Sequence, residues 1–589
     1  MRRGVLHAGA WLAAAATSLF TAGCAGGGGP SSDLLISGGT VVDGSGAPGR
    51  VADVLVSGGR IAAVGDLSHE RAAHVVDAHG LVVAPGFIDM HSHADLILLA
   101  DGATQERLLG AKILQGVTTL VVGNCGLGTA PSSESAAEVL SSVNGWMTPA
   151  GVGAGALSVG EYLSRLERGG VALNVGTLVP HGPVRLSAFG PAAGHPSAEE
   201  LSRMRELVRL ALGEGAFGLS VGLIYPPGMY TDTDELIALA REVAAADGVF
   251  TAHVRGSSET LLEATGELLE IARESGARVH HSHLEAVGES YWPDVARVLD
   301  MEDAARGEGL AVTHDMFPYT RAATMMSAIF PPWSLDGGVP ALLERLRDPA
   351  TRDRIRQDLE RLRPEWPPWR PGAWPHNLVG AVGWDGIQVA SVGSEDGSRA
   401  VGESLEELAE ERGAHPFDVV AELMLEESGQ VGQLVLEISG RDEQADALQR
   451  ILRHPAGAIV SDAEDYGRGR PHPAHAGALA RALRLSREPG GLPLEETVRK
   501  MTGAPARILG LEDRGRIVPG AAADFTLFDP REVTDRASWD EPRRVADGVS
   551  TVVIGGRVVV EDGRYLGGAP GQVLRSRRPL AVRAVRVDR

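Results

Sequence analysis

The chain has 589 residues, which is enough for one large catalytic domain and a smaller companion domain. Its 77 acidic residues outnumber its 55 basic residues, so the formal net charge is −22. A balance this acidic argues against nucleic acid, or an anionic membrane surface, as the binding partner.

The first residues have a pattern typical of an export signal. Met1-Arg2-Arg3 precedes an apolar stretch over residues 8–20, and small residues then lead to Cys24. The apolar run is too short, and too soon followed by Gly, Ser and Pro, for a membrane-spanning helix. It resembles a bacterial lipoprotein signal, which implies removal of residues 1–23 and a membrane-anchored, exported protein with a lipid on Cys24; plain secretion is the alternative. Residues 24–32 are predicted to be a flexible tether.

Short β-rich pieces broken by glycine occur at both ends of the chain. They lie within residues 33–84 and return within residues 506–575. Neither set is expected to make a stable sheet alone, so we predict one small β-sandwich domain built from both segments. Residues 576–589 are assigned to a C-terminal tail.

Eight short apolar runs, separated by segments with helical spacing of apolar residues, lie between these ends. They are centred on residues 87–89, 119–122, 173–175, 217–220, 249–252, 278–280, 311–313 and 458–460. Strands that alternate with helices in this number favour an α/β fold, a (β/α)8 TIM-type barrel, over residues 85–505. The gap between the last two runs is too long for one helix, so residues 320–450 are predicted to be an insertion that caps the barrel mouth.

Residues that can bind a metal follow several of these runs. They are His91 and His93 after the first run, Cys125 after the second, His253 after the fifth, His283 after the sixth and Asp462 after the eighth. In a parallel barrel all strands end on one face, where active sites lie, so these side chains are expected to converge. Because His91 and His93 are two residues apart on extended backbone, their side chains point the same way.

This set of donors favours a catalytic zinc site. Imidazole, thiolate and carboxylate are ligands of zinc, and zinc lowers the pKa of bound water to about 7. Asp462 is the candidate base that takes the proton of that water and passes it to a leaving nitrogen.

Each of these residues also has a structural alternative. Taken singly, a histidine is more often a core residue with its hydrogen bonds satisfied, and Cys125 is more often a small buried residue. Their joint position at strand ends favours the metal. The sequence also points to Asp89 as the partner of a ligand histidine, and to His280, His281 and His314 as orienting or packing residues.

Several motifs resemble the amidohydrolase superfamily. Residues 85–93 (PGFIDMHSH) are similar to its first-strand signature. The chain resembles the D-aminoacylase (N-acyl-D-amino-acid deacylase) branch over roughly residues 33–575. The matching pieces are residues 123–126 (GNCG), 218–228 (GLSVGLIYPPG), 253–255 (HVR), 282–284 (SHL), 315–319 (DMFPY), 461–462 (SD) and 514–520 (RGRIVPG).

The resemblance implies a role for each candidate residue. It places a tightly held zinc on Cys125, His253 and His283, and a weaker second metal near His91 and His93 that shares Cys125. Asp462 is then the general base and later the acid, while Tyr225 and Arg255 face the substrate and Tyr225 stabilises the developing oxyanion. Many related enzymes bridge two metals with a carboxylated lysine. Lys112 and Lys500, the two lysines of this chain, lie before the second strand and after the eighth, so Cys125 fits the bridging role better.

Two positions depart from this branch. Glu285 stands where the branch usually has a lysine, and Ala474 stands where it has the arginine that binds the substrate's carboxylate. Alanine cannot supply a bidentate guanidinium clamp. Glu285 is therefore a candidate substrate-binding residue, and Arg468, Arg470 or His475 are candidate replacements for the arginine.

The predicted function is zinc-dependent hydrolysis of a carbon–nitrogen amide bond in a small molecule, with N-acyl-D-amino acid deacylation as the first expectation. Another linear or cyclic amide, such as a dipeptide or a hydantoin-like ring, is the alternative that Glu285 and Ala474 favour. A non-catalytic lipoprotein that binds a small molecule in a decayed site is the remaining alternative. The oligomeric state is not predicted.

Overall fold

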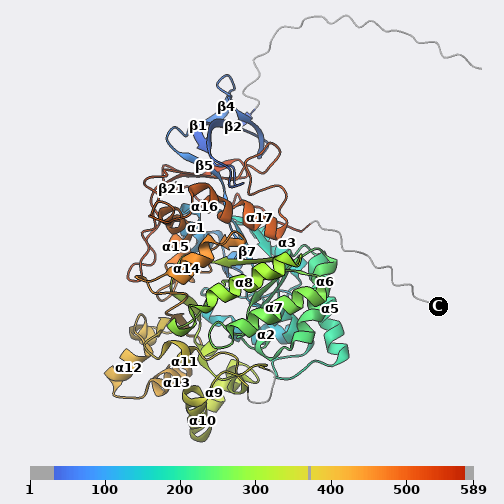
Figure 1. The fold of residues 1–589 in the computed structure, drawn as a ribbon, viewed down its shortest axis with the longest axis vertical. Helices are drawn as coiled ribbons and strands as arrows, with labels where there is room; N and C mark the ends of the chain where they lie inside the picture. Colours follow the sequence, from blue (N-terminus) through green and yellow to red (C-terminus); the bar gives the residue numbers. More distant parts are fainter. Residues whose placement is uncertain (1–31, 369–372, 577–589) are drawn as a thin grey trace, which may run out of the picture.

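The computed structural model describes residues 32–368 and 373–576. The predicted signal peptide, Cys24 and all but the last residue of the predicted tether lie outside the described residues. Within the described part of the chain, no helix is long and apolar enough to cross a lipid bilayer. Figure 1 shows a β domain at one end, a central barrel with its helices, and a mainly helical region at the other end.

Eight parallel strands form the barrel. They are β6 (Phe87–Asp89), β7 (Val117–Val122), β8 (Asn174–Thr177), β10 (Gly218–Gly222), β11 (Val249–His253), β12 (Arg278–His281), β13 (Val312–Met316) and β17 (Gly457–Ile459). One ladder joins β6, β7 and β8, and another runs from the short β9 (Val179–Pro180) through β10, β11, β12 and β13 to β17. Every predicted apolar run overlaps one of these strands, so the predicted (β/α)8 barrel is confirmed.

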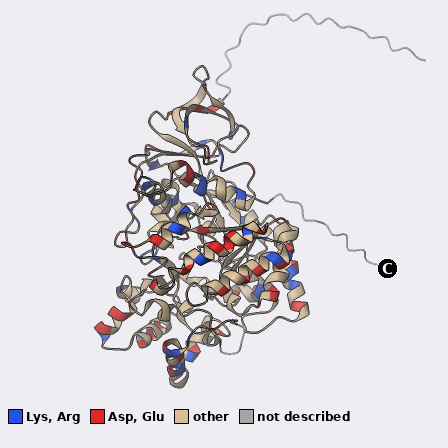
Figure 2. Ribbon diagram, viewed as in Figure 1, with Lys and Arg blue, Asp and Glu red and all other residues tan. Residues whose placement is uncertain are grey.

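Helices cover the outside of the barrel. They are α1 (Gly102–Leu114), α2 (Glu134–Val143), α3 (Val159–Gly169), α4 (His181–Ala188), α5 (Ala198–Gly213), α6 (Thr233–Ala245), α7 (Leu261–Ser275), α8 (Asp294–Gly307), α14 (Asp446–Arg453), α15 (Ala474–Leu485), α16 (Leu494–Met501) and α17 (Gly503–Leu509). In α5, Ser197 and Glu200 form a capping box, and the buried Met204, Val208 and Ala211 recur at helical spacing. Figure 2 shows acidic and basic residues interspersed over the outer helices.

Apolar side chains from strands around the barrel fill its interior. Ile88, Val121, Val249 and Val460 belong to one buried cluster, which Ile508 of α17 joins. The Arg278 side chain, at the start of β12, donates a hydrogen bond to the carbonyl of Ile508, so α17 lies at the amino ends of the strands. With that end filled, the carboxyl ends of the strands form the open face of the barrel.

Strands from both ends of the chain form one sheet. They are β1 (Ser32–Val41), β2 (Arg50–Ser57), β3 (Arg60–Gly65), β4 (Ala72–Asp77), β5 (Val82–Pro85), β18 (Phe525–Phe528), β19 (Val549–Ile554), β20 (Arg557–Glu561) and β21 (Arg564–Tyr565). The order is β21-β20-β19-β18-β5-β1-β2-β3, with β4 paired to the first half of β1. The sheet encloses a core that includes Ile36 and Val54 from one end and Phe525 and Leu527 from the other. The predicted β domain is thus one continuous sheet around a shared core.

The chain between β13 and β17 forms an additional region. It contains an antiparallel sheet of β14 (Ala322–Met325), β16 (Gly432–Val435) and β15 (Ile387–Ser391), and the helices α9 (Val339–Arg347), α10 (Pro349–Arg361), α11 (Leu378–Val382), α12 (Leu405–Arg412) and α13 (Pro416–Glu426). Figure 1 shows it at the end of the barrel opposite the β domain. Residues 322–324 and Leu378 line the same cavity as the candidate metal ligands. The region therefore covers the carboxyl ends of the strands.

Candidate metal centre and cavity

Three predicted ligands bring their donor atoms together at the open end of the barrel. The Nε2 atom of His91 lies 3.2 Å from the Sγ atom of Cys125, which lies 3.5 Å from the Nε2 atom of His283. The donor atoms of these residues all lie within 4.8 Å of one another, and all three side chains are buried. They have the residue types and spacing to hold one metal ion between them.

A second group of donors shares His91. The Oδ1 atom of Asp462 lies 3.3 Å from the Nε2 atom of His91 and 3.3 Å from that of His93. His253 lies alongside, with its ring centroid 4.4 Å from that of His283. Neither ring nitrogen of His253 has a hydrogen-bond partner among the described residues. Buried polar atoms normally have partners, so this imidazole fits a metal ligand. The structure thus brings together the residues predicted at the strand ends.

The backbone turns sharply where three of these side chains leave their strands. Cys125, His283 and Asp462 have φ angles of 50°, 32° and 46°. For residues other than glycine this conformation costs roughly 1–3 kcal/mol, and such residues cluster at functional sites. The turns place one sulfur, one imidazole and one carboxylate at the mouth of the barrel.

The electrostatics of the site favour anionic forms of Cys125 and Asp462. Burial alone would raise the pKa of the Cys125 thiol, but the neighbouring His91 and His283 hold it well below its usual value. Burial also opposes ionisation of Asp462, and His91 and His93 nevertheless hold the pKa of its carboxyl below the ordinary value. Thiolate and carboxylate are the forms in which these side chains bind metals.

Asp315, at the carboxyl end of β13, contacts one of the candidate ligand histidines. Its carboxylate lies 3.2 Å from the Nδ1 atom of His91 and 2.8 Å from the Nε2 atom of His280. A carboxylate on Nδ1 fixes the ring so that Nε2 faces the metal site. The position of Asp315 at the end of a strand is the sequence signal that could have indicated this role. Asp89, which the sequence points to for this role, contacts Lys112 instead.

Lys112 links the ends of β6 and β17, the two barrel strands whose following loops carry candidate ligands. No ladder between β6 and β17 is present in the described residues. The Nζ atom of Lys112 lies 2.8 Å from Asp89, 3.0 Å from Glu464 and 2.5 Å from Ser461. Glu464 in turn accepts a hydrogen bond from the Ser92 hydroxyl at 2.6 Å. The lysine therefore ties the loop of His91 and His93 to the loop of Asp462.

A cavity lies over the donor atoms, between the barrel mouth and the additional region. Its lining comprises the candidate metal-site residues His93, Cys125, His253, His283 and Asp462, the polar residues Tyr225, Glu285, Thr324 and His376, and the apolar residues Leu127, Trp146, Ile224, Val287, Ala322, Ala323, Leu378, Val435 and Ile438. The Tyr225 hydroxyl lies 2.8 Å from the Thr324 hydroxyl, and its ring centroid lies 5.0 Å from that of His253. Thr324 belongs to the additional region, and we found no sequence signal for it.

The predicted substrate-binding residues do not all line the cavity. Tyr225 and Glu285 line the cavity, whereas Arg255 is not among its lining residues. The Arg255 Nε atom donates to Glu267 of α7 at 2.7 Å, and both side chains are buried. The structure therefore places this guanidinium group in an ion pair between β11 and α7. Burial raises the pKa of Glu285 to about 7, and its carboxylate lies 3.3 Å from the Ser257 hydroxyl.

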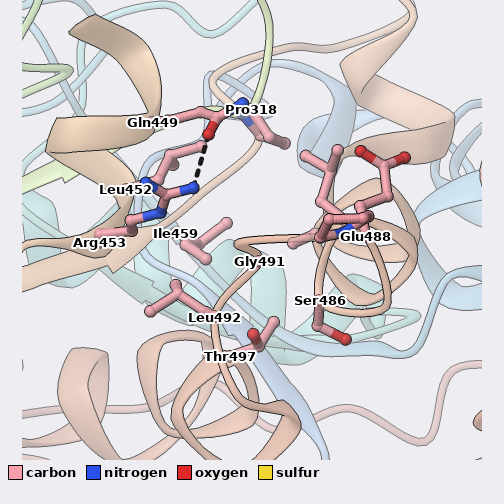
Figure 3. Close-up of a pocket in the computed structure, with 13 residues that line it drawn as sticks. Pro318, Gln449, Leu452, Arg453, Ile459, Ser486, Glu488, Gly491, Leu492 and Thr497 are labelled. Atoms are coloured by element: carbon pink, nitrogen blue, oxygen red, sulfur yellow. Dashed lines mark hydrogen bonds between the residues drawn. The ribbon is translucent and has the colours of Figure 1, made fainter. Parts of the chain in front are cut away.

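A second pocket lies on the outside of the barrel. Figure 3 shows it between α14, α15 and the loop before α16, with apolar walls that include Leu452, Ile459 and Leu492. The Arg453 guanidinium donates to Gln449 at 2.7 Å. None of the candidate metal ligands is among the described lining residues of this pocket, so the cavity over Cys125 and Asp462 is the candidate active site.

Comparison with known proteins agrees with the barrel and with a candidate metal site at its mouth. Residues 74–560 match the amidohydrolase family. The chain belongs to this family. It is 33% identical over 553 residues to the N-acyl-D-glutamate deacylase of Alcaligenes xylosoxydans xylosoxydans, covering 92% of this chain and 96% of that protein.

Two solved structures are similar over nearly the whole chain. The N-acyl-D-glutamate deacylase of Bordetella bronchiseptica, complexed with zinc and a phosphonate that mimics the tetrahedral intermediate, has a TM-score of 0.75 and 32% identity, over 93% of this chain and all of that one. A D-aminoacylase with a binuclear metal centre has the same TM-score and identity over 92% of this chain and 100% of its own. The resemblance to the D-aminoacylase branch, and the enzyme class of amidohydrolase, are confirmed.

Proposed function

We propose that this enzyme is a zinc-dependent hydrolase that uses Asp462 to activate water against an amide bond of a small molecule. The observation that carries the proposal is the convergence of His91, Cys125 and His283, and of His91, His93 and Asp462, on sets of donor atoms within 4.8 Å. Metal-dependent amide hydrolysis is also the chemistry that the similar proteins support.

The residues at the barrel mouth fit a zinc ion. As the resemblance implies, Cys125, His253 and His283 would hold the first ion, and His91 and His93, with Cys125, would hold a second. The donor atom of His91 also lies within 4.8 Å of those of Cys125 and His283, so the two sites would adjoin. The thiol with a lowered pKa and the unsatisfied nitrogens of His253 support this choice, since zinc takes thiolate and neutral imidazole. Bound zinc supplies a Lewis acid that polarises a carbonyl and lowers the pKa of water.

The residues of the chain supply the proton transfers. The Asp462 carboxylate, at the cavity wall, accepts a proton from the attacking water, whose oxygen bonds to the amide carbon. The same proton then passes to the nitrogen as the carbon–nitrogen bond breaks, giving a carboxylic acid and an amine. The Tyr225 hydroxyl, held by Thr324 at 2.8 Å, donates a hydrogen bond to the oxyanion that develops on the carbonyl oxygen.

The names of the relatives favour an N-acylated amino compound as the substrate. N-acyl-D-glutamate and N-acyl-D-aspartate are the compounds named for two of them. An N-acyl-D-amino acid is therefore the first substrate to test, and a dipeptide or a cyclic amide the alternative. The test is amine release by zinc-loaded protein from a panel of these amides, with Asp462→Asn as the inactive variant. A lack of turnover across the panel, by protein that contains zinc, contradicts the proposal.

We also propose that the enzyme is exported and held at a membrane by a lipid on Cys24. The basic start, the short apolar run and the small residues before Cys24 support this location. Cys24→Ala should move the protein from the membrane fraction to the soluble fraction and abolish incorporation of labelled palmitate. Unchanged fractionation of this variant contradicts the anchor.

A further inference from the structure

We infer that the substrate carries a basic group, such as an ammonium or guanidinium, and that Glu285 binds this group in the cavity over the metal centre. The inference rests on the proposed hydrolysis of an amide and specifies its substrate class. It follows from the charges of the cavity wall and from where the nearby basic residues are engaged.

Outside the candidate metal-site residues, Glu285 is the acidic residue of the described cavity wall. No lysine or arginine is among the described lining residues. His376 also lines the cavity, with Nδ1 2.8 Å from the Ser258 hydroxyl. Burial lowers the pKa of His376 to about 3, so this imidazole is neutral at physiological pH. Outside the candidate metal-site residues, a substrate carboxylate would therefore find no cationic side chain on the described wall.

Arg255 and two of the candidate replacements for a carboxylate-binding arginine are engaged elsewhere. The third candidate, Arg470, is exposed and is not among the lining residues of the cavity. Arg255 pairs with Glu267 of α7 at 2.7 Å. Arg468 donates to the carbonyls of Gly145 and Thr148. His475 is paired through Nδ1 with the carbonyl of His472 at 2.9 Å. None of these basic residues lines the cavity.

Glu285 has capacity to accept hydrogen bonds from a ligand. Its side chain is only 9% exposed, and its carboxylate takes one long hydrogen bond, 3.3 Å from the Ser257 hydroxyl. The Nδ1 atom of His283 is 3.7 Å away, which is too far for a hydrogen bond. A carboxylate has room for about four hydrogen bonds, and a buried one is stabilised by a charged donor. A substrate cation supplies that donor, whereas a substrate carboxylate supplies none.

The remaining wall suits an apolar body for the same substrate. Leu127, Trp146, Ile224, Val287 and Leu378 line the cavity around Glu285 and the metal ligands. Apolar walls with a few placed polar groups are typical of small-molecule sites. The substrate is thus an amide with an apolar part and one basic group.

The test compares compounds that share a skeleton and differ in charge. N-acetyl-D-leucine carries a carboxylate, N-acetyl-D-leucinol is neutral, and the monoacetylated diamine in which aminomethyl replaces the carboxylate carries an ammonium; glycyl-D-leucinamide puts the ammonium on the acyl side. We expect kcat/KM at least tenfold higher for an ammonium compound than for N-acetyl-D-leucine. Equal or better turnover of N-acetyl-D-leucine overturns the inference and leaves the proposed function standing.

Substitutions at Glu285 test whether this residue causes the preference for the ammonium compounds. Glu285→Gln should remove the preference for ammonium, and Glu285→Lys should reverse it, whereas Glu289→Gln, at an exposed glutamate just after the same loop, should leave it unchanged. If the lysine variant does not fold, the glutamine variant decides, and an unchanged preference in it overturns the inference.

A binding measurement separates the inference from the proposed function. Calorimetry with zinc-loaded Asp462→Asn protein should give tighter binding of the ammonium compounds than of N-acetyl-D-leucine. If no compound is cleaved but this order of affinity is found, the proposed hydrolysis fails, while the binding of a basic group in the cavity stands. If N-acetyl-D-leucine binds as tightly as the ammonium compounds, the inference fails.

Discussion

The Lys112 ammonium lies 2.8 Å from the Asp89 carboxylate, and neither side chain has any exposed surface. Burial lowers the pKa of Lys112, but Asp89 and Glu464 more than offset this and raise it above its usual value. The Ser461 hydroxyl is a third partner of Lys112, and Ser461 is the residue just before Asp462. This cation therefore sets the spacing of the two loops that carry the candidate ligands.

Replacement of Lys112 should therefore be strongly destabilising. Lys112→Met leaves the buried carboxylates of Asp89 and Glu464 without their cation, which costs about 3–5 kcal/mol of the free energy of unfolding. Urea unfolding followed by circular dichroism measures the loss. Lys500→Met is the matched control, since it removes the other lysine away from the metal centre. Equal stability of the two variants near pH 7 would contradict the role of Lys112.

Lys500 should make the stability of the protein depend on pH. Its buried Nζ donates to the carbonyls of His454 and Gly457, and burial lowers its pKa to about 7. Between pH 7 and the unfolded value of 10.5 the unfolded chain binds the extra proton, so this group makes stability rise with pH in that window. Lys500→Met removes this contribution. The stability of wild type relative to the variant should increase by about 1.4 kcal/mol per pH unit above pH 7 and stay flat below it.

One outcome of a pH series would contradict this prediction for Lys500. Urea unfolding of both proteins at pH 6, 7, 8 and 9 gives the difference in the free energy of unfolding at each pH. A difference that stays constant from pH 7 to 9 would mean that Lys500 keeps its ordinary pKa in the folded protein.

The strands were predictable from the sequence because each is a short apolar run between segments with helical spacing, and a candidate metal ligand follows five of the runs. The candidate ligands came from the same signal, since His91 and His283 each follow such a run. The supporting contacts were not predictable in this way. Lys112 and Ser461 are 349 residues apart, and a lysine in a helix gives no sign of a partner that distant.

Arg255 shows the limit of a motif. It follows His253 in a piece that resembles the D-aminoacylase branch, and the sequence therefore suggested a role toward substrate. In the structure its side chain pairs with Glu267, twelve residues further along the chain. A motif identifies the residue type, but the direction of a side chain depends on which partner the next helix supplies.

Asp315 should control metal affinity through His91. Asp315→Ala removes the carboxylate 3.2 Å from the His91 Nδ1 atom and should weaken zinc binding about 10–100-fold, as loss of such partners does elsewhere. Competition with a chromogenic chelator measures this affinity without reference to turnover. Glu235→Gln is the control, because Glu235 is also a buried carboxylate but pairs with His181 and Arg185. Equal zinc affinity of the two variants would exclude the orienting role.

Tyr225 and Thr324 should act together on the chemical step. Tyr225→Phe removes the hydroxyl that donates to the developing oxyanion, and kcat should fall about 10²-fold with little change in KM, because the hydrogen bond strengthens only in the transition state. Thr324→Val keeps the tyrosine but removes its partner at 2.8 Å, and should give a smaller fall in kcat. Steady-state kinetics on the best substrate, with zinc content measured on each variant, distinguishes this role from a loss of metal. If Tyr225→Phe raises KM while kcat is unchanged, Tyr225 binds the ground state of the substrate and does not stabilise the oxyanion.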